Sequence, residues 1–171
     1  MVTLVIFMEN LKLVKIKDKD LILKGISFDN EHTCYNNYNN IEDVLIGLIT
    51  SATNYGIYYK DEFIGIISIY NQYYKDLTRL ELSICIKKEY RNKKIGKYCF
   101  DYVISESFKN PNNKSIHLSI REDNIKSIML AKKCGFKLYR GYKSCDNFID
   151  LNGNKIHQEQ YLLKRKDYIK K

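Results

Sequence analysis

Two stretches of the chain decide its fold: residues 79–103, RLELSICIKKEYRNKKIGKYCFDYV, and residues 115–136, SIHLSIREDNIKSIMLAKKCGF. From Leu80 to Ile86 apolar residues alternate with other residues, which predicts a β-strand. From Ile95 the apolar residues recur at helical spacing. The second stretch repeats the order of strand, turn and helix and closes with a glycine. Together they predict two parallel strands joined by a crossover helix.

The turn between the first strand and its helix carries the strongest chemical signal. Residues 91–96, RNKKIG, lie across a helix N-terminus, where backbone amides without an intrahelical partner attract anions. Arg91, Lys93, Lys94 and Lys97 add positive charge, so a diphosphate would fit, although a solvated basic turn would show the same charges. Gly96 favours the binding hypothesis, because a glycine in a helix costs about 1 kcal/mol relative to alanine, a cost that the close approach of a ligand or a neighbouring backbone would explain.

These residues resemble the acetyl-CoA motif of the GNAT acetyltransferases. Arg91-x-x-Lys94-x-Gly96 is similar to Q/R-x-x-G-x-G/A, with Lys94 where glycine is usual. The run that begins Asn124-x-x-Ser127 and ends K-x-G-F at residue 136 is similar to the second coenzyme segment of that family. Its form is usual in the branch that holds ribosomal-protein N-terminal acetyltransferases and spermidine acetyltransferases.

The resemblance implies an α/β (α+β) fold with one GNAT-like domain over residues 1–171. Its mixed central sheet would have about seven strands and flanking helices, and the pantetheine arm of acetyl-CoA would lie between splayed fourth and fifth strands. Backbone groups of the central strand would bind pantetheine, the basic turn would hold the pyrophosphate, and the second helix would line the far side. The implied coenzyme-binding residues are Ile84, Cys85, Ile86, Arg91, Asn92, Lys93, Lys94, Ile95, Gly96, Lys97, Asn124 and Ser127. Asn124 is also a candidate helix N-cap.

The implied reaction moves an acetyl group from acetyl-CoA to a primary amine, such as a peptide N-terminus, a polyamine or another small amine, by direct attack in a ternary complex. Glu81 is the candidate base; alternatively it only attracts a cationic substrate or pairs with Arg79. Many relatives place an acid tyrosine seven residues after the motif asparagine, where this chain has Ala131. Three other tyrosines are candidates for that role, namely Tyr139, Tyr142 and Tyr161.

Two other classes of function stay open at this point. One is a non-catalytic coenzyme-binding domain on the same fold, because fold does not determine function. The other is a basic nucleic-acid-binding domain, which the net charge of +9 would suit but the scattered lysines do not favour. A polyamine acceptor would need an acidic cluster at the cleft mouth, and the candidates for it are Asp29, Glu31, Glu42 and Asp43.

The remaining composition predicts a globular protein of a reducing compartment. Of the 171 residues 44% are hydrophobic, which suits a chain with a packed core. The five cysteines form no C-x-x-C pair, and neither a disulfide framework nor a metal site is expected. Residues 1–8 are too short for a membrane span and lack a basic leader. A cytoplasmic protein without nucleic-acid or membrane partners is expected, with an amine acceptor and, in one alternative, a second copy of the chain as its partners.

Elsewhere the pattern predicts short elements separated by turn signals. The expected strands are 11–17, 53–60, 63–70, 115–121, 136–143 and 157–164. The expected helices are one capped by Asp18 that runs to about Phe28, and one over residues 41–50. Residues 29–40 and 73–78 are expected to be loops, and Asn152-Gly153 is expected to be a hairpin turn.

Overall fold

The structure is a computed structural model that describes residues 5–28, 47, 49–71, 78–143 and 155–168. Its strands are Val5–Met8 (β1), Leu11–Ile16 (β2), Ala52–Tyr59 (β3), Glu62–Tyr70 (β4), Arg79–Ile86 (β5), Ser115–Arg121 (β6), Lys137–Lys143 (β7) and Gln158–Lys164 (β8). Its helices are Lys19–Ile26 (α1), Ile95–Lys109 (α3), Ile125–Lys133 (α4) and Arg165–Tyr168 (α5), with a 3-10 turn at Lys88–Tyr90 (η2). The predictions for residues 29–46, 73–77 and 152–153 lie outside the described residues.

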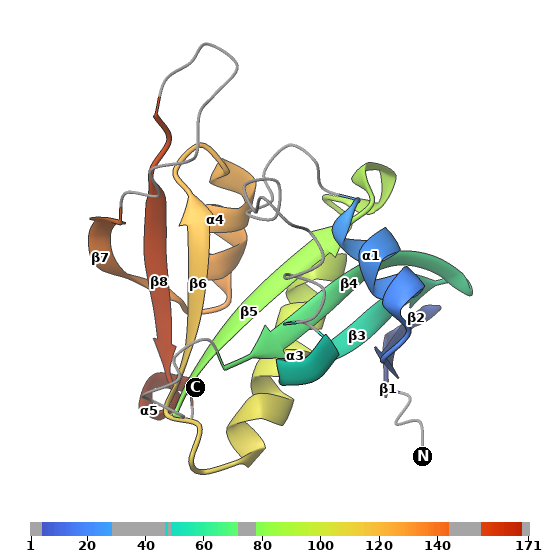
Figure 1. The fold of residues 1–171 in the computed structure, drawn as a ribbon, viewed down its shortest axis with the longest axis horizontal. Helices are drawn as coiled ribbons and strands as arrows, with labels where there is room; N and C mark the ends of the chain where they lie inside the picture. Colours follow the sequence, from blue (N-terminus) through green and yellow to red (C-terminus); the bar gives the residue numbers. More distant parts are fainter. Residues whose placement is uncertain (1–4, 29–46, 48, 72–77, 144–154, 169–171) are drawn as a thin grey trace.

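The described strands form one mixed sheet in the order β1-β2-β3-β4-β5-β6-β8-β7. All neighbours are antiparallel except β5 and β6, which are parallel (Figure 1). The predicted mixed sheet is therefore confirmed. The sequence pattern missed β1, a four-residue strand that pairs with β2 and adds an edge strand. Because β1 precedes all the expected strands, those expected as the fourth and fifth carry the labels β5 and β6.

The parallel pair is short, and its end creates the opening in the sheet. Its register runs from Arg79–Ser115 through Leu80–Ile116 to Glu81–His117, and beyond these pairs the two strands diverge (Figure 1). On its other edge β5 stays paired with β4 as far as Ile86. The predicted splay is confirmed, and it begins directly after Glu81.

Helix α1 covers one face of the sheet. It begins after Asp18, whose carboxylate accepts a hydrogen bond of 2.8 Å from the amide of Leu21, as the capping prediction requires. Ile22 and Ile26 are buried in a cluster with Ile66 of β4. Cys85 of β5 belongs to the same cluster, which shows that its side chain points toward α1.

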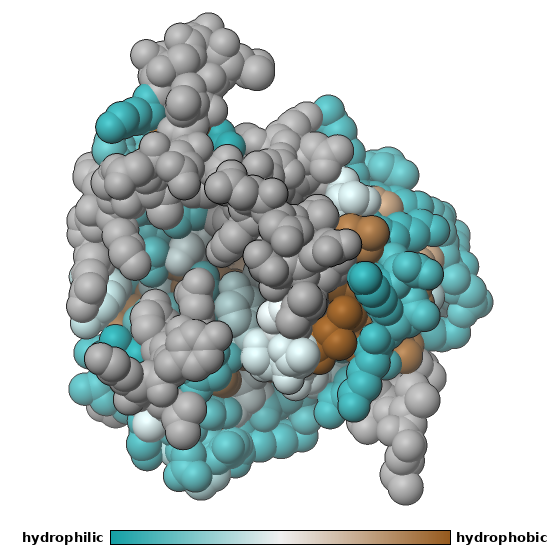
Figure 2. Space-filling view, viewed as in Figure 1, coloured by the Kyte–Doolittle hydropathy of each residue, from teal (hydrophilic) through white to brown (hydrophobic). Residues whose placement is uncertain are grey.

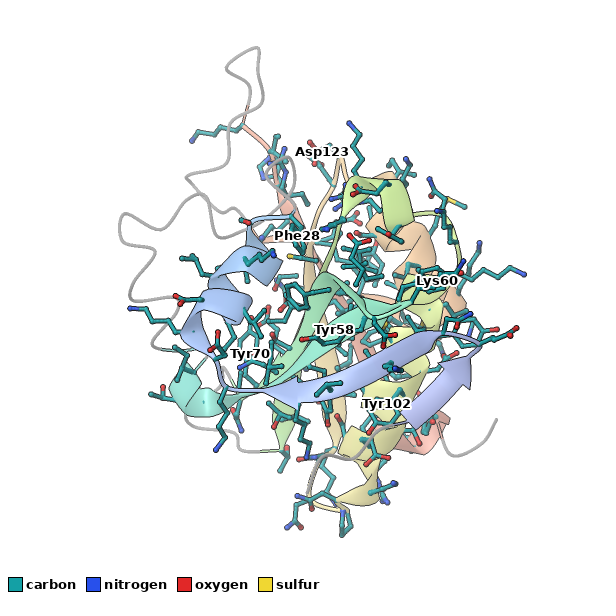
Figure 3. All side chains as sticks on the ribbon, turned by 90° about the vertical axis from the view of Figure 1, so that its right-hand side faces the viewer. Phe28, Tyr58, Lys60, Tyr70, Tyr102 and Asp123 are labelled. Atoms are coloured by element: carbon teal, nitrogen blue, oxygen red, sulfur yellow. The ribbon has the colours of Figure 1, made fainter. Side chains whose placement is uncertain are left out.

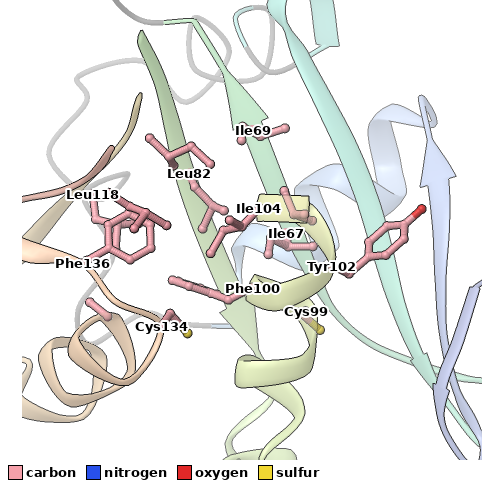
Figure 4. Close-up of a cluster of buried hydrophobic side chains, with 14 of the residues drawn as sticks. Ile67, Ile69, Leu82, Cys99, Phe100, Tyr102, Ile104, Leu118, Cys134 and Phe136 are labelled. Carbon is pink, nitrogen blue, oxygen red and sulfur yellow. The ribbon is translucent and has the colours of Figure 1, made fainter. Parts of the chain in front are cut away.

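Helices α3 and α4 cover the opposite face, where the larger core lies (Figure 1). Phe100 and Ile104 of α3 pack with Leu82 of β5 and Leu118 of β6 (Figure 4). Burying one such side chain contributes about 1.5–3 kcal/mol relative to leaving it exposed. Because side chains alternate along a strand, Leu82 on this face places Glu81 on the α1 face.

Three described cysteines are buried as small hydrophobic residues, as predicted. Cys85, Cys99 and Cys134 are free thiols, and burial raises the pKa of the Cys99 thiol. Cys134 is the C-cap residue of α4 and packs in the core. Within the described residues, no helix is long and apolar enough to cross a membrane.

The C-terminal strands enter the sheet out of chain order. β8 pairs with β6 along its whole length, and β7 forms the edge beyond it. Both strands lie where the sequence predicted them. The chain then turns into α5, whose Tyr168 ring lies 5.3 Å from the ring of Phe108 at the end of α3.

Candidate functional site

A cleft of about 1040 Å³ opens between the diverging end of β5 and α4, on the side of α3. Both halves of the sequence signal contribute to its walls. The expected coenzyme residues that line it are Ile84, Ile86, Arg91, Asn92, Lys94, Gly96, Lys97, Asn124 and Ser127. Cys85, Lys93 and Ile95 are not among the described lining residues: Cys85 points toward α1, Lys93 lies over the Tyr90 ring, and Ile95 is buried in the core.

The edge of β5 away from β4 turns the backbone groups of two residues outward, and one of these groups, the Ile86 carbonyl, accepts a hydrogen bond from Arg91. The amide of Lys87 donates to the Ile64 carbonyl of β4 at 2.9 Å, and the Cys85 carbonyl oxygen would lie only 2.3 Å from a Cβ built on Gly65 of β4. Both groups therefore face β4. Since backbone polar groups alternate between the two edges of an antiparallel strand, those of Ile84 and Ile86 face the cleft. This separates Cys85 from the expected pantetheine-binding residues.

The turn after β5 has a left-handed backbone at two residues. Asn92 and Lys94 both have a φ of 63°, a backbone conformation that residues other than glycine and asparagine rarely adopt. Lys94 is the N-cap residue of α3, and no side chain caps the helix there. Lys94 thus has a backbone conformation that glycine adopts more readily. The first turn of α3 therefore has no side-chain cap at its N-terminus, and Gly96 and Lys97 of that turn line the cleft.

Arg91 anchors this turn. Its Nε donates to the Ile86 carbonyl at 2.8 Å, and its Nη2 donates to the carbonyl of Phe28 at 2.9 Å. Phe28 lies between α1 and the turn (Figure 3), and Lys87 lies 5.3 Å from the centre of its ring. The sequence pattern counted Arg91 as charge for a phosphate. The structure shows that its guanidinium also ties the end of β5 to the end of α1.

A second set of contacts holds η2 against β4. Lys87 and Tyr90 each contact one oxygen of the Glu62 carboxylate at 2.5 Å. Both hydrogen bonds lower the pKa of Glu62, and the one from Lys87 has the larger effect. The start of the 91–96 turn is therefore held to Phe28 through Arg91 and to β4 through Lys87 and Tyr90.

Gly96 lies on the side of α3 that faces Leu130 of α4 in this cleft. A Cβ built on Gly96 would lie 3.1 Å from Cδ2 of Leu130 in α4 and 3.8 Å from Cδ1 of Ile86. The nearest neighbour is thus a side chain rather than a backbone. Glycine at this position lets the two helices approach and keeps the cleft wall open.

The N-terminus of α4 forms the far wall. Asn124 is its N-cap, and its side chain oxygen accepts a hydrogen bond of 3.2 Å from the amide of Ser127. The capping alternative is therefore confirmed, and both residues also line the cleft. Sequence analysis missed Ile125 and Met129, which are 58% and 52% exposed and line the cleft too. The sequence signal that could have found them is their spacing: they are an apolar pair at i, i+4, offset by one residue from the buried side of α4.

The described cleft is positively charged overall. Its basic lining residues are Lys88, Arg91, Lys94, Lys97, Lys126 and Lys133, and its acidic ones are Asp101 and Asp123. Lys97 contacts Asp101 at 2.5 Å, and this hydrogen bond raises the pKa of the Lys97 ammonium. A polyanion therefore suits the cleft better than a cation does.

The α1 face of the sheet carries buried polar side chains beside the splay. Glu81 is 6% exposed, and its register partner His117 is 3% exposed. His117 is buried because β6 lies inside the sheet, between β5 and β8. His117 Nε2 lies 3.3 Å from the hydroxyl of Ser115. Figure 2 shows this face, with hydrophobic side chains next to α1 and hydrophilic ones along the lower edge.

The tyrosines named as candidate acids lie in different environments. Tyr161 is buried on the α3 side, where its hydroxyl donates to Glu159; burial, and then this hydrogen bond, raise its pKa. Tyr139 lies on the Glu81 face, with its ring edge-on to His117 at 5.9 Å. The side chain of Tyr142 lies outside the described part. Ala131 is fully buried in α4.

The fold and cleft agree with the comparison against known families. The model of the acetyltransferase (GNAT) family matches residues 18–136. The chain therefore belongs to this family of acetyltransferases, and acetyl-CoA is its co-substrate. No curated protein matches the chain.

Solved structures share the fold at low sequence identity. A chimera of spermidine N-acetyltransferase SpeG from Vibrio cholerae and hSSAT superposes with a TM-score of 0.75 at 17% identity, covering 95% of this chain and 99% of that one. RimL, a ribosomal-protein alpha-N-acetyltransferase solved with coenzyme A, superposes at 0.72 and 16% identity, covering 95% and 98%. A dodecameric spermidine N-acetyltransferase from Vibrio cholerae gives 0.72 and 17%, also covering 95% and 98%. These neighbours are of the two kinds indicated by the motif resemblance, which is confirmed.

Proposed function

We propose that this chain transfers the acetyl group of acetyl-CoA to a primary amine by direct attack in a ternary complex. The observation that carries the proposal is the end of β5–β6 pairing at Glu81–His117. Beyond it, the cleft on the α3 side meets the opening in the sheet, while Glu81 stands on the α1 face. A pantetheine arm along Ile84 and Ile86 would bring its thioester to this opening, beside the carboxylate.

Each wall of the cleft has a role in this proposal. The first-turn amides of α3 and the basic side chains around them bind the pyrophosphate. Ile125 and Met129 offer apolar surface to the pantetheine arm or the adenine. The amide of Ile84 or Ile86 donates to the oxyanion of the tetrahedral intermediate.

Proton transfer is assigned to the α1 face. The amine must lose a proton before it attacks, and Glu81 accepts that proton, directly or through a water molecule. The leaving group is a thiolate, which is a much weaker base than an alkoxide, so a dedicated acid is dispensable. Tyr139 is the described candidate tyrosine that lies on the Glu81 face.

Coenzyme binding without catalysis is the second candidate, and Ala131 at the usual tyrosine position favours it. Two measurements separate the candidates. Acetyl-CoA and dephospho-coenzyme A should both raise the melting temperature, and a panel of amines should then show release of free thiol. Stabilisation without thiol release from any amine would support the second candidate, and absence of both effects would overturn both. A cytoplasmic location stays a prediction.

A further inference from the structure

A second pocket, of about 570 Å³, lies at the end of the sheet where β5 and β6 begin. We call it the basic pocket, because five of its lining residues are cationic, namely Arg79, Lys114, Lys164, Arg165 and Lys166. None of the described residues that line it is acidic. A pocket of this composition attracts anions and repels cations.

The register of three strands brings these charges together. Ser115 of β6 pairs with Arg79 of β5 on one side and with Lys164 of β8 on the other. Neighbouring strands lie about 4.8 Å apart, and register partners point to the same face of a sheet. Arg79 and Lys164 therefore flank Ser115 on the face that carries His117.

Two of the other cations are held at the rim by neutral groups. Arg165 Nε donates to the Phe108 carbonyl at 3.2 Å, and Lys114 Nζ donates to the Pro111 carbonyl at 3.0 Å. The amide of Arg165 also donates to the Lys114 carbonyl at 2.9 Å. Carbonyl partners orient these side chains without cancelling their charge, so the pocket keeps its positive character.

The basic pocket adjoins the proposed site of acetyl transfer. His117 lines the pocket and is the register partner of Glu81. Arg79 precedes Glu81 by two residues on the same face, which is about 6.6 Å along a strand. An extended peptide covers that distance in about two residues.

We propose that the basic pocket binds an anionic group carried by the acceptor, about two residue lengths from the amine. The inference rests on the proposed acetyl transfer and names its substrate class: a peptide N-terminus with an acidic or phosphorylated second or third residue, or a small amine with an equivalent anion. A polyamine lacks that anion and adds positive charge beside Arg79.

The test compares peptide amides that differ only in the third residue. The acceptors are Ser-Ala-Asp, Ser-Ala-phosphoserine, Ser-Ala-Asn and Ser-Ala-Lys, and kcat/KM is measured at low and high salt. The anionic peptides should exceed the asparagine peptide by about fivefold or more at low salt, with a smaller ratio at high salt. The aspartate and phosphoserine arms distinguish a carboxylate site from a phosphate site. Equal kcat/KM for the aspartate, phosphoserine and asparagine peptides would overturn the proposal.

Variants show whether the preference arises in this pocket. The double variant Lys164→Gln/Lys166→Gln should lose most of the charge preference while its stabilisation by acetyl-CoA stays unchanged. Lys132→Gln, an exposed change on α4, removes a charge elsewhere and should keep the preference. A preference that survives in the double variant would contradict the assignment.

Direct binding keeps this inference separate from the proposed function. Calorimetry with Ser-Ala-Asp amide and coenzyme A should show tighter binding to the wild type than to the double variant, even if no amine is acetylated. Loss of turnover alone would then count against catalysis, and equal peptide binding by both proteins would count against the basic pocket.

Discussion

Glu81 and His117 form the last register pair of the parallel strands β5 and β6, and both side chains are buried on the α1 face of the sheet. The cleft opens on the other face directly beyond this pair. A carboxylate and an imidazole thus lie at the point where β5 and β6 stop pairing. This is where a thioester from one face and an amine from the other could come together.

If Glu81 deprotonates the amine, Glu81→Gln should lower kcat far more than it weakens coenzyme binding. A general base typically contributes about 10²–10⁴-fold in rate. The acidic limb of the pH profile should also disappear, because the group that titrates there is gone. Both kinetic parameters should be measured across pH with an amine found by screening. His117→Gln is the matched control on the partner strand, and it should keep the acidic limb.

The competing role of Glu81 is attraction of a cationic amine. Glu81→Gln would then raise KM and leave kcat nearly intact. An unchanged kcat with an unchanged acidic limb would remove Glu81 from the proton transfer.

Gly96→Val should weaken coenzyme binding by about tenfold or more, or about 1.4 kcal/mol. Its branched side chain would enter the cleft wall beside the 91–96 turn. Gly96→Ala is the control: its Cβ would meet Leu130 at 3.1 Å and should change stability by less than about 1 kcal/mol. Coenzyme titration and thermal melts of both variants separate the two effects. Normal binding by a folded Gly96→Val protein would leave Gly96 with a packing role alone.

The stability of Lys94 variants should depend on how well each new residue tolerates a positive φ. Lys94→Gly and Lys94→Asn should both keep the fold, because these residues tolerate positive φ. Lys94→Val should unfold at lower denaturant, with a loss of about 1–3 kcal/mol from a β-branched residue held in that conformation. Equal stability of the valine and asparagine variants would show that the turn relaxes. A weaker affinity for acetyl-CoA in both the glycine and asparagine variants would measure the contribution of the lysine charge.

Substitutions of Asn124 should separate the effect of helix capping from that of coenzyme binding. Asn124→Ala removes the hydrogen bond to the Ser127 amide and should cost about 1 kcal/mol of stability. Asn124→Asp retains a capping oxygen but adds a negative charge to the cleft wall. It should melt close to the wild type and bind acetyl-CoA more weakly, while Asn124→Ser should be close to normal in both. Unchanged affinity in the aspartate variant would place the coenzyme away from this helix end.

The sequence alone was sufficient for the elements that carry the coenzyme signal. The alternation from Leu80 to Ile86 and the helical spacing after Ile95 are local patterns, so β5, α3 and the α4 cap could be predicted. The four-residue strand β1 could not, because it becomes a strand only by pairing with β2. The exposed cleft residues Ile125 and Met129 were missed for the same kind of reason: their exposure depends on what packs against α4.

Only the tertiary structure decided which groups face the site. Sequence placed Ile84, Cys85 and Ile86 together as pantetheine ligands, but pairing with β4 turns the backbone of Cys85 away from the cleft. Arg91 reads as a free charge in sequence, yet its guanidinium reaches the carbonyl of Phe28, 63 positions away. The basic pocket likewise joins Arg79, Ser115 and Lys164, which no local pattern connects. Periodicity reports the burial of one element, whereas register and strand order determine which distant side chains become neighbours.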